Sequence, residues 1–411
     1  MIEKVNCPVC GGDKTVEIWS HASGIADGVC LICGHAYLIR QKSKEEIIAG
    51  YQDFKQEYPD AYLADPKNEL FERAQLRHEF LARNIPKTVP INSILEVGCA
   101  YGHFLSLFAS NMIRAGIEPS KDQFDFAMRH FNLQEIINSP YELIDNLPKE
   151  WPHDGFDLFC SYHVIEHIKD PGHLLAFAHR ILKPNGYICV AAPNLFCLSP
   201  DLIEYYFLIR NWHLNIFSPS SLSMLLIRFG FEIVNWETEP LSAMLRNSFI
   251  LLARKHNMNQ LQVNPLINTQ KSEQALKDFH NRLDQHIYFI LQALDDWYRQ
   301  GLTIYIYGAG IHTSALLELP GINKKYFKYI IDDDQKKWGL KINDILVINL
   351  DDALALKPDV ILVSSLASEE SILQKLGQRL TTSKVVGIYR DLALQMNFEM
   401  NKNEDRYEAI R

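Results

Sequence analysis

The residues with the clearest chemical meaning lie between Ile94 and Gly102, in ILEVGCAYG, and in the AGIEPS that follows. Gly98 and Gly102 let the backbone turn sharply and approach a ligand without a Cβ in the way. Glu118 lies twenty residues beyond Gly98, where a carboxylate after a second strand can accept hydrogen bonds from ribose hydroxyls. A dinucleotide site prefers GxGxxG, with a helix N-terminus on a pyrophosphate, whereas this chain has ExGxxxG beginning at Glu96. The pattern therefore predicts a nucleoside cofactor without a phosphate.

Four of the eight cysteines form two CxxC pairs, Cys7 with Cys10 and Cys30 with Cys33, separated by nineteen residues. This spacing is typical of a tetrahedral four-cysteine zinc site. Four thiolates leave no open coordination position, so we expect a structural Zn²⁺ that lets a segment of about 35 residues fold. Disulfides are the alternative, which a reducing cytosol disfavours. His35 is a spare ligand that the fourth cysteine makes redundant.

Three later segments extend the first pattern: FDLFCSYHVIEHIKDP from Phe156, ILKPNGYICVAAP from Ile181, and the pair GFEIVNWE and NSFILLARK, which ends at Lys255. With ILEVGCAYG they resemble the class I S-adenosylmethionine-dependent methyltransferases over roughly residues 77 to 255. The resemblance implies a Rossmann-like core with a seven-stranded sheet and S-adenosylmethionine as cofactor. An ordinary doubly wound domain with an empty crevice is the alternative. The residues that the resemblance places at the cofactor are Glu96, Gly98, Cys99, Gly102, Glu118, Tyr162 and His163.

His163, Glu166 and His167 also spell HxxEH, the motif of the inverted zinc peptidases, in which both histidines bind metal. The motif follows a strand-like FDLFCSY and precedes a turn at Lys169-Asp170-Pro171, so no long helix is expected to present both histidines from one face. The peptidase interpretation is therefore set aside. In the methyltransferase interpretation His167 faces the acceptor.

The chain has 411 residues, which is more than one core usually supports, so two or three domains are expected. The predicted fold is α/β: a zinc-ribbon-like module, the methyltransferase core and a second Rossmann-like domain. We place the zinc module at 1–45, the methyltransferase domain with a helical cover at 46–256, a linker and long helix at 257–300, and the C-terminal domain at 301–411.

A net charge of −9 without a basic tract argues against nucleic acid as a partner. No uncharged stretch reaches the length of a membrane span, and no signal-peptide pattern is present, so a cytoplasmic protein is expected. The expected partner is a small-molecule substrate.

The C-terminal part repeats a strand, glycine turn and helix in TIYIYGAGIHTSALLEL from Thr303, with Gly308 and Gly310 in the turn. Asp332 ends the next strand at about the position that meets a ribose. This half either binds a nucleotide, so that these three residues contact substrate, or serves as a scaffold. Apolar residues at helical spacing predict a long amphipathic helix at about 274–298 before it.

The order zinc site, methyltransferase, long helix and Rossmann-like domain resembles the sugar C-methyltransferases that act on nucleotide-linked deoxy sugars. The resemblance implies a histidine after the fourth strand, which His167 matches, and a Tyr-x-Glu-His motif, whose last position His213 matches. Arg210 and Trp212 replace the tyrosine and glutamate of that motif, so carbon and oxygen methylation both stay open. Further residues that we expect to contact the substrate, from the helical cover and the aromatic insertion, are Tyr58, Tyr62 and Trp212.

A sulfonium is already a good leaving group, so the enzyme has to align a nucleophile with the methyl carbon and remove its proton. A histidine that titrates near neutral pH suits this task, and His213 or His167 is the hypothesised general base. We therefore predict methyl transfer to a sugar or nucleotide sugar. The alternatives are another small-molecule acceptor, or a zinc-ribbon adaptor that binds cofactor or partner without turnover.

Overall fold

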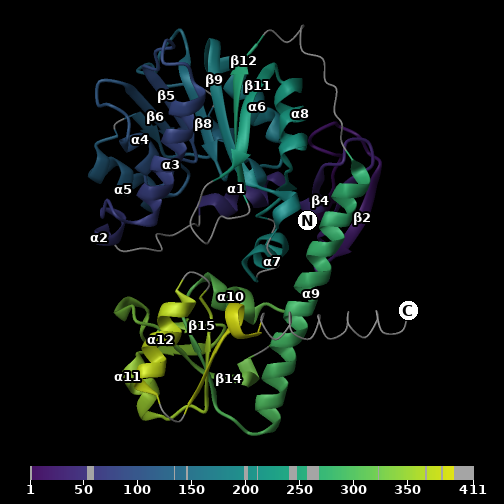
Figure 1. Cartoon of the computed structure of the whole chain (residues 1–411), viewed down its shortest axis with the longest axis vertical. Coiled ribbons are helices and arrows are strands. Elements are labelled where there is room, and N and C mark those ends of the chain that lie inside the picture. The colour runs from purple at the N-terminus through teal and green to yellow at the C-terminus, as the bar shows by residue number, and fades with distance from the viewer. Residues whose placement is uncertain are drawn as a thin grey trace. The chain divides into compact units, whose positions relative to one another are not determined.

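The computed structural model describes residues 2–52, 60–133, 135–144, 147–198, 202–210, 212–239, 248–256, 268–322, 324–365, 368–380 and 383–392. The chain forms two compact units. The first consists of 1–198 with 208–277, and the second of 199–207 with 278–411. Figure 1 shows the helices and strands of each unit.

The first unit is built on a seven-stranded sheet in the order β11-β12-β9-β8-β5-β6-β7. All neighbours are parallel except β12, which is antiparallel to both β9 and β11. This is the strand order of a class I methyltransferase fold, so the predicted fold class is confirmed. The strands are β5 (Ser93–Val97), β6 (Ile113–Ile117), β7 (Glu135–Ile137), β8 (Phe156–Tyr162), β9 (Leu182–Pro193), β11 (Phe231–Thr238) and β12 (Ser248–Lys255).

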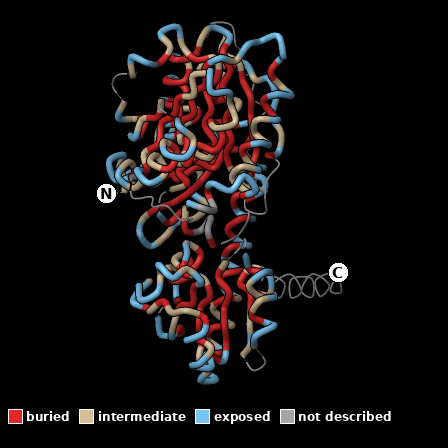
Figure 2. The backbone as a smooth tube through the Cα atoms, turned by 90° about the vertical axis from the view of Figure 1, so that its left-hand side faces the viewer, coloured by how far each residue is buried: buried red, intermediate tan, exposed pale blue. Residues whose placement is uncertain are grey.

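Helices cover both faces of this sheet because its central strands are apolar on both sides (Figure 2). Ile94 and Leu158 pack with Phe80 of α3 and Phe104 of α4, whereas Leu95 belongs to the core on the opposite face with α6 and α8. The helices are α3 (Glu69–Asn84), α4 (His103–Ser106), α5 (Lys121–Phe131), α6 (Pro171–Ile181) and α8 (Pro219–Arg228). The helix α4 that follows the glycine turn is a single turn.

The N-terminal residues form a small antiparallel sheet in the order β1-β4-β3-β2, and β10 (Asn215–Ile216) pairs with β4. His35 is buried, and its Nε2 atom lies 3.2 Å from Asn215 Oδ1. Its ring stacks on the ring of Tyr37, so His35 faces the methyltransferase core. The elements are β1 (Ile2–Lys4), β2 (Thr15–Ser20), β3 (Ala26–Cys30), β4 (Ala36–Lys42), α1 (Lys44–Gln52) and α2 (Asp60–Leu63).

The long helix α9 (Thr269–Arg299) confirms the predicted amphipathic helix and buries Leu276, Phe279, Leu283 and Leu294. The second unit contains a six-stranded sheet in the order β15-β16-β14-β13-β17-β18, parallel except for β15. Its elements are β13 (Ile304–Tyr307), α10 (Ile311–Leu317), β14 (Phe327–Ile331), β15 (Lys341–Ile342), β16 (Ile345–Ile348), α11 (Leu350–Ala355), β17 (Val360–Val363), α12 (Glu369–Arg379) and β18 (Lys384–Gly387). The second Rossmann-like domain is thus present.

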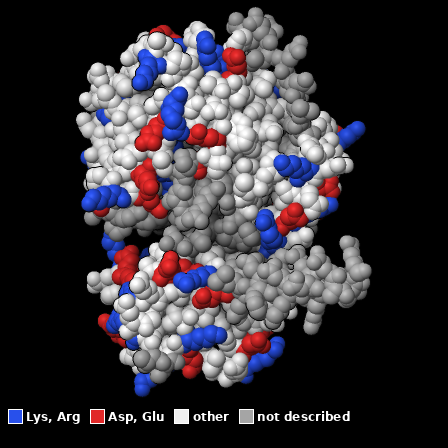
Figure 3. Space-filling view, viewed as in Figure 1, with Lys and Arg blue, Asp and Glu red and all other residues white. Residues whose placement is uncertain are grey.

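Acidic and basic side chains are interspersed on the face shown in Figure 3, in keeping with the modest net charge. Within the described ranges, none of the helices combines the length and the apolar character required to cross a bilayer.

Candidate functional site

The glycine turn after β5 is tied to the end of β6. Gly98 and Gly102 have φ values of +75° and +82°, which glycine adopts without strain. Glu118, the residue after β6, accepts hydrogen bonds from the backbone N–H groups of Ala100 at 2.9 Å and Ser120 at 2.7 Å. Burial raises the pKa of Glu118 to about 7, although these two N–H groups act in the opposite direction.

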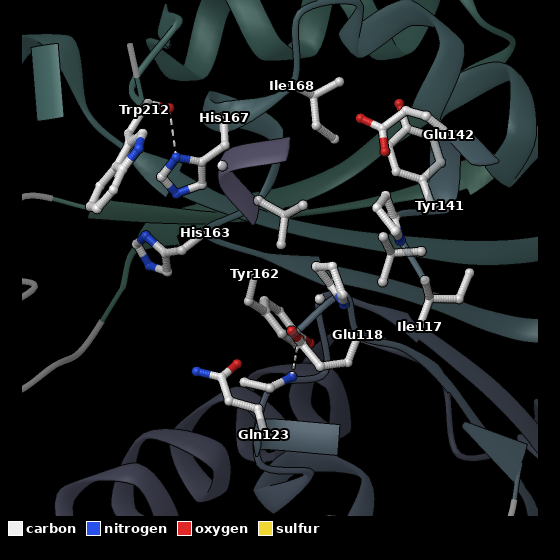
Figure 4. Close-up of a pocket in the computed structure, with 17 residues that line it drawn as sticks. Ile117, Glu118, Gln123, Tyr141, Glu142, Tyr162, His163, His167, Ile168 and Trp212 are labelled. Atoms are coloured by element: carbon white, nitrogen blue, oxygen red, sulfur yellow. Dashed lines mark hydrogen bonds between the residues drawn. The ribbon is translucent and has the colours of Figure 1, made fainter. Parts of the chain in front are cut away.

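A pocket opens where β5, β6 and β8 end, the position at which α/β sheets bind ligands (Figure 4). Glu118 reaches it from the end of β6, Tyr162 and His163 reach it from the end of β8, and Trp212 closes one side. Its lining is mostly apolar, which suits the uncharged rings of a nucleoside. The lining residues are Gly50, Val97, Gly98, Ala100, Ile117, Glu118, Pro119, Gln123, Pro140, Tyr141, Glu142, Tyr162, His163, Val164, His167, Ile168 and Trp212.

The predicted cofactor residues divide into two groups. Those that line the pocket are Gly98, Glu118, Tyr162 and His163, and those that do not are Glu96, Cys99 and Gly102. A Cβ on Gly102 would lie 2.7 Å from Leu133 Cδ1, so this glycine is required by packing. Glu96 is buried in β5, and burial raises its pKa to about 8. Its Oε2 atom has no hydrogen-bond partner among the described residues.

His163 is fixed between two buried carboxylates. Its Nε2 lies 2.8 Å from Glu239 Oε2, and its Nδ1 lies 3.4 Å from Glu166 Oε1. Arg77 Nε donates a hydrogen bond to the other oxygen of Glu239 at 2.7 Å. The guanidinium group of Arg77 lies over the ring of Tyr162. Burial lowers the pKa of His163, but the carboxylates outweigh this effect and raise it. A histidine with acceptors at both nitrogens is an imidazolium.

His167 and His213, the two candidate bases, lie next to each other with ring centroids 5.0 Å apart. Of these two histidines His167 lines the pocket, whereas His213 is 6% exposed and is not among the lining residues. His167 Nδ1 is 2.6 Å from the carbonyl oxygen of Trp212. Since a carbonyl only accepts, Nδ1 carries the proton and Nε2 keeps the lone pair in the neutral ring. Burial lowers the pKa of His167, which favours this neutral form.

Of the three aromatic residues expected at the substrate, Trp212 lines the pocket. Tyr58 lies outside the described residues, and Tyr62 belongs to α2 with a side chain outside the described part.

The HxxEH residues do not form a peptidase site. Glu166 and His167 lie in a three-residue 3₁₀ turn, and His163 precedes it with a φ of +55°. No long helix carries the two histidines, as predicted. Among the described residues, the group of possible metal ligands in this region contains Glu166, His167 and His213 but not His163.

The four N-terminal cysteines converge as their spacing predicts. All four Sγ atoms lie within 4.8 Å of one another, with 3.5 Å between Cys7 and Cys33 and between Cys10 and Cys30. None of these four cysteines forms a disulfide. Around a tetrahedral zinc ion with Zn–S of about 2.3 Å, sulfurs lie about 3.8 Å apart, so this donor set fits the ion.

The C-terminal glycine turn repeats the geometry at Glu118. Gly308 has a φ of +109°, and Asp332 accepts hydrogen bonds from the N–H groups of Ala309 at 2.7 Å and Asp334 at 2.8 Å. Lys337 Nζ lies 3.3 Å from the same carboxylate. Asp332 therefore holds the loop containing Gly308 and Gly310 through its hydrogen bond with Ala309.

Sequence reasoning missed several residues of the site. Gln123, Tyr141 and Glu142 line the pocket from α5 and from the segment after β7. Their position after β6 and β7, the parallel strands on one side of β5, was an available signal. Arg77 and Glu239 carried no local signal, because 162 residues separate them.

Two family models match the chain. One described as "Methyltransferase domain" matches residues 60–235, and one described as "C-methyltransferase C-terminal domain" matches residues 253–386. An uncharacterized methyltransferase of Schizosaccharomyces pombe is 24% identical, over 37% of this chain and 57% of that protein. A probable S-adenosylmethionine-dependent methyltransferase of Mycolicibacterium smegmatis is 25% identical, over 38% and 58% respectively. The chain thus spans less than two thirds of the length of these relatives.

Among solved structures, a methyltransferase from Mesorhizobium loti is 18% identical, with 44% of this chain and 98% of that chain covered and a TM-score of 0.35. A TM-score of this size supports no conclusion about this chain.

Proposed function

We propose that the protein transfers a methyl group to a small-molecule acceptor. The premise is the central domain, which is a class I S-adenosylmethionine-dependent methyltransferase domain by family match and strand order. The observation that carries this proposal is a single pocket lined by Gly98, Glu118 and the candidate base His167, with Glu118 and His167 on different sides of it (Figure 4). A cofactor site and a proton acceptor share one cavity, as the reaction requires.

The residues at the glycine turn fit the cofactor. A Cβ on Gly98 would lie 2.3 Å from Val164 Cγ2, so the turn leaves room only for glycine. The Glu118 carboxylate holds the turn through Ala100 and has further lone pairs for ribose hydroxyls. When bound, S-adenosylmethionine supplies an electrophilic methyl group on its sulfonium.

His167 is the proposed general base, and His213 is assigned to its support. The lone pair of His167 Nε2 is directed by the contact of Nδ1 with Trp212, and the side chain lines the pocket. His213 lies next to this ring and is not among the residues that line the pocket. Proton removal by a positioned base is typically worth a factor of about 10² to 10⁴ in rate.

The proposed acceptor is a carbon atom of a sugar or nucleotide sugar, acidified by a neighbouring carbonyl. The match of residues 253–386 to the C-terminal domain of C-methyltransferases supports carbon over oxygen. Arg210 and Trp212, which replace the tyrosine and glutamate of the sugar enzymes, keep methylation of a hydroxyl as the second candidate. In either case Gly308, Gly310 and Asp332 are proposed to contact the nucleotide part or to support that domain.

Zinc is proposed to be structural. Cys7, Cys10, Cys30 and Cys33 would hold Zn²⁺ with four thiolates and no open position. The ion would stabilise the β3-β4 region, whose strand β4 pairs with β10 close to His213.

The test combines binding with product analysis. Calorimetry should show S-adenosylmethionine binding, and labelled methyl transfer to a panel of keto sugar nucleotides should identify the acceptor atom by NMR. His167→Asn is expected to lower turnover at least about 100-fold with cofactor binding retained. Absence of cofactor binding would refute the proposal, and binding without transfer to any acceptor would favour the non-catalytic adaptor.

A further inference from the structure

Glu166 is a buried carboxylate for which the reaction scheme above has no role. It lies in the turn after β8, and its side chain is 1% exposed. Its Oε2 atom has no hydrogen-bond partner among the described residues, while Oε1 lies 3.4 Å from His163 Nδ1 and 4.0 Å from His167 Nε2. An ionised carboxylate at a buried position costs free energy unless a cation compensates its charge. The presence of Glu166 at this position therefore calls for a physical explanation.

Glu166 is held in the ionised state by His163. Burial alone would raise the pKa of Glu166, but the hydrogen bond with His163, together with the neighbouring His167 and His213, outweighs burial and lowers it. His163 is in turn fixed by Glu239, whose second oxygen binds Arg77. The four side chains alternate in charge from Arg77 to Glu166, so the series is neutral overall and ends with a negative group beside the pocket.

We propose that Glu166 is a positioning residue that stabilises the imidazolium of His167 after it has taken a proton from the acceptor, an inference that rests on the proposed function. Nδ1–H of His167 is directed to the Trp212 carbonyl, so the incoming proton goes to Nε2, the nitrogen 4.0 Å from Glu166. The N–H bond forms as the acceptor C–H or O–H bond breaks. The freed electron pair of the acceptor would bond to the methyl carbon of S-adenosylmethionine, while the bond from that carbon to sulfur would break and leave its electron pair on the sulfur of S-adenosylhomocysteine. The new positive charge on the ring then faces the carboxylate.

The charged groups around His167 act in opposite directions. Burial lowers its pKa, Glu166 raises it, His213 and His163 lower it, and the hydrogen bond to the Trp212 carbonyl raises it. Glu166 is therefore the charged group that opposes the lowering of the pKa of this buried histidine. If Glu166 lost its charge, no carboxylate would counteract the lowering of the His167 pKa by His163 and His213.

A metal ion at Glu166, His167 and His213 is the competing explanation. Their ligand atoms lie within 4.8 Å of one another, but the 4.0 Å between Glu166 Oε1 and His167 Nε2 exceeds the spacing of about 3.4 Å expected for oxygen and nitrogen ligands of a tetrahedral zinc ion. The observations favour direct carboxylate–imidazolium stabilisation.

The test is the pH titration of His167 in the whole protein with its cysteine site loaded. NMR of the imidazole, assigned by the signal missing from His167→Asn, should show a pKa about one unit or more lower in Glu166→Gln than in the parent protein. The low-pH limb of the kcat/KM profile should shift in the same direction. Glu166→Asp should recover part of the shift, and Glu232→Gln, at an exposed position on β11, should leave both readouts unchanged.

The outcomes are distinguishable. An unchanged His167 titration in a folded Glu166→Gln variant would overturn the positioning role. So would a second equivalent of Zn²⁺, bound by the parent protein and lost in His213→Ala. If no acceptor is ever methylated, the proposed function fails, but the NMR titration still tests the pairing of Glu166 with His167.

Discussion

The carboxylate of Glu118 lies 2.9 Å from the backbone nitrogen of Ala100, so the residue that ends β6 also holds the turn that ends β5. One side chain therefore fixes the shape of the loop and offers acceptors to the ligand. Replacing Glu118 by Gln should weaken S-adenosylmethionine binding about 10- to 100-fold, because hydrogen bonds to a charged acceptor become bonds to a neutral amide. Calorimetry measures the affinity for S-adenosylmethionine, and Glu150→Gln, at an exposed position, is the control. Equal affinities would remove Glu118 from the cofactor site.

The same carboxylate predicts how cofactor binding depends on pH. Burial raises the pKa of Glu118 to about 7, so the free protein is largely protonated there at pH 6 and ionised at pH 8. Ribose hydroxyls donate to the ionised form, and affinity should increase with pH through about 7 and then level off. Calorimetric titrations between pH 5.5 and about 8.5 would show the curve. In Glu118→Gln this rise should be absent.

Gly98→Ala should abolish cofactor binding without unfolding the chain. The new Cβ would lie 2.3 Å from Val164 Cγ2 at a φ of +75°, so both sterics and backbone conformation oppose it. Gly377→Ala is the matched control, because this glycine lies inside α12 with no atom within 4 Å of an added Cβ. The control should raise the free energy of unfolding by up to about 1 kcal/mol. Normal binding by Gly98→Ala would show that the turn does not approach the cofactor.

How far the sequence predicts the site depends on the range of the contacts. Gly98, Glu118 and the four cysteines were accessible because short-range motifs place them on turns whose geometry is general. Contacts such as His163 with Glu239, 76 residues apart, arise from loops that meet only when the sheet has formed. The pairing of β10 with β4 has the same origin, since residues 215 and 37 come from separate motifs. The choice between His167 and His213 likewise needed the structure, because both share the same local chemistry.

The ion pair between Arg77 and Glu239 should make stability sensitive to acid. Burial opposes ionisation of Glu239, but Arg77 and His163 outweigh it and lower its pKa from the ordinary 4.5 to about 2. The stabilisation is present above pH 4.5 and is lost as the pH falls towards 2. Urea denaturation of Arg77→Leu should show a loss of roughly 3–5 kcal/mol at neutral pH, because Glu239 loses a buried partner. A loss below about 1 kcal/mol would show that the pair contributes little.

The removal of zinc should affect turnover more than cofactor binding. Cys7→Ser takes one thiolate from the four-cysteine cluster, and the β3-β4 region should then lose its support. Because β4 pairs with Asn215 and Ile216, the neighbouring His213 and Trp212 should lose their fixed positions against His167. Gly98 and Glu118 belong to the other sheet and should still bind S-adenosylmethionine within a few-fold of the parent affinity. Metal analysis, thermal unfolding and methyl transfer measured together check this, with the exposed Cys197→Ser as control. Full turnover in a zinc-free variant would mean that the cysteine module has no part in holding the acceptor side of the pocket.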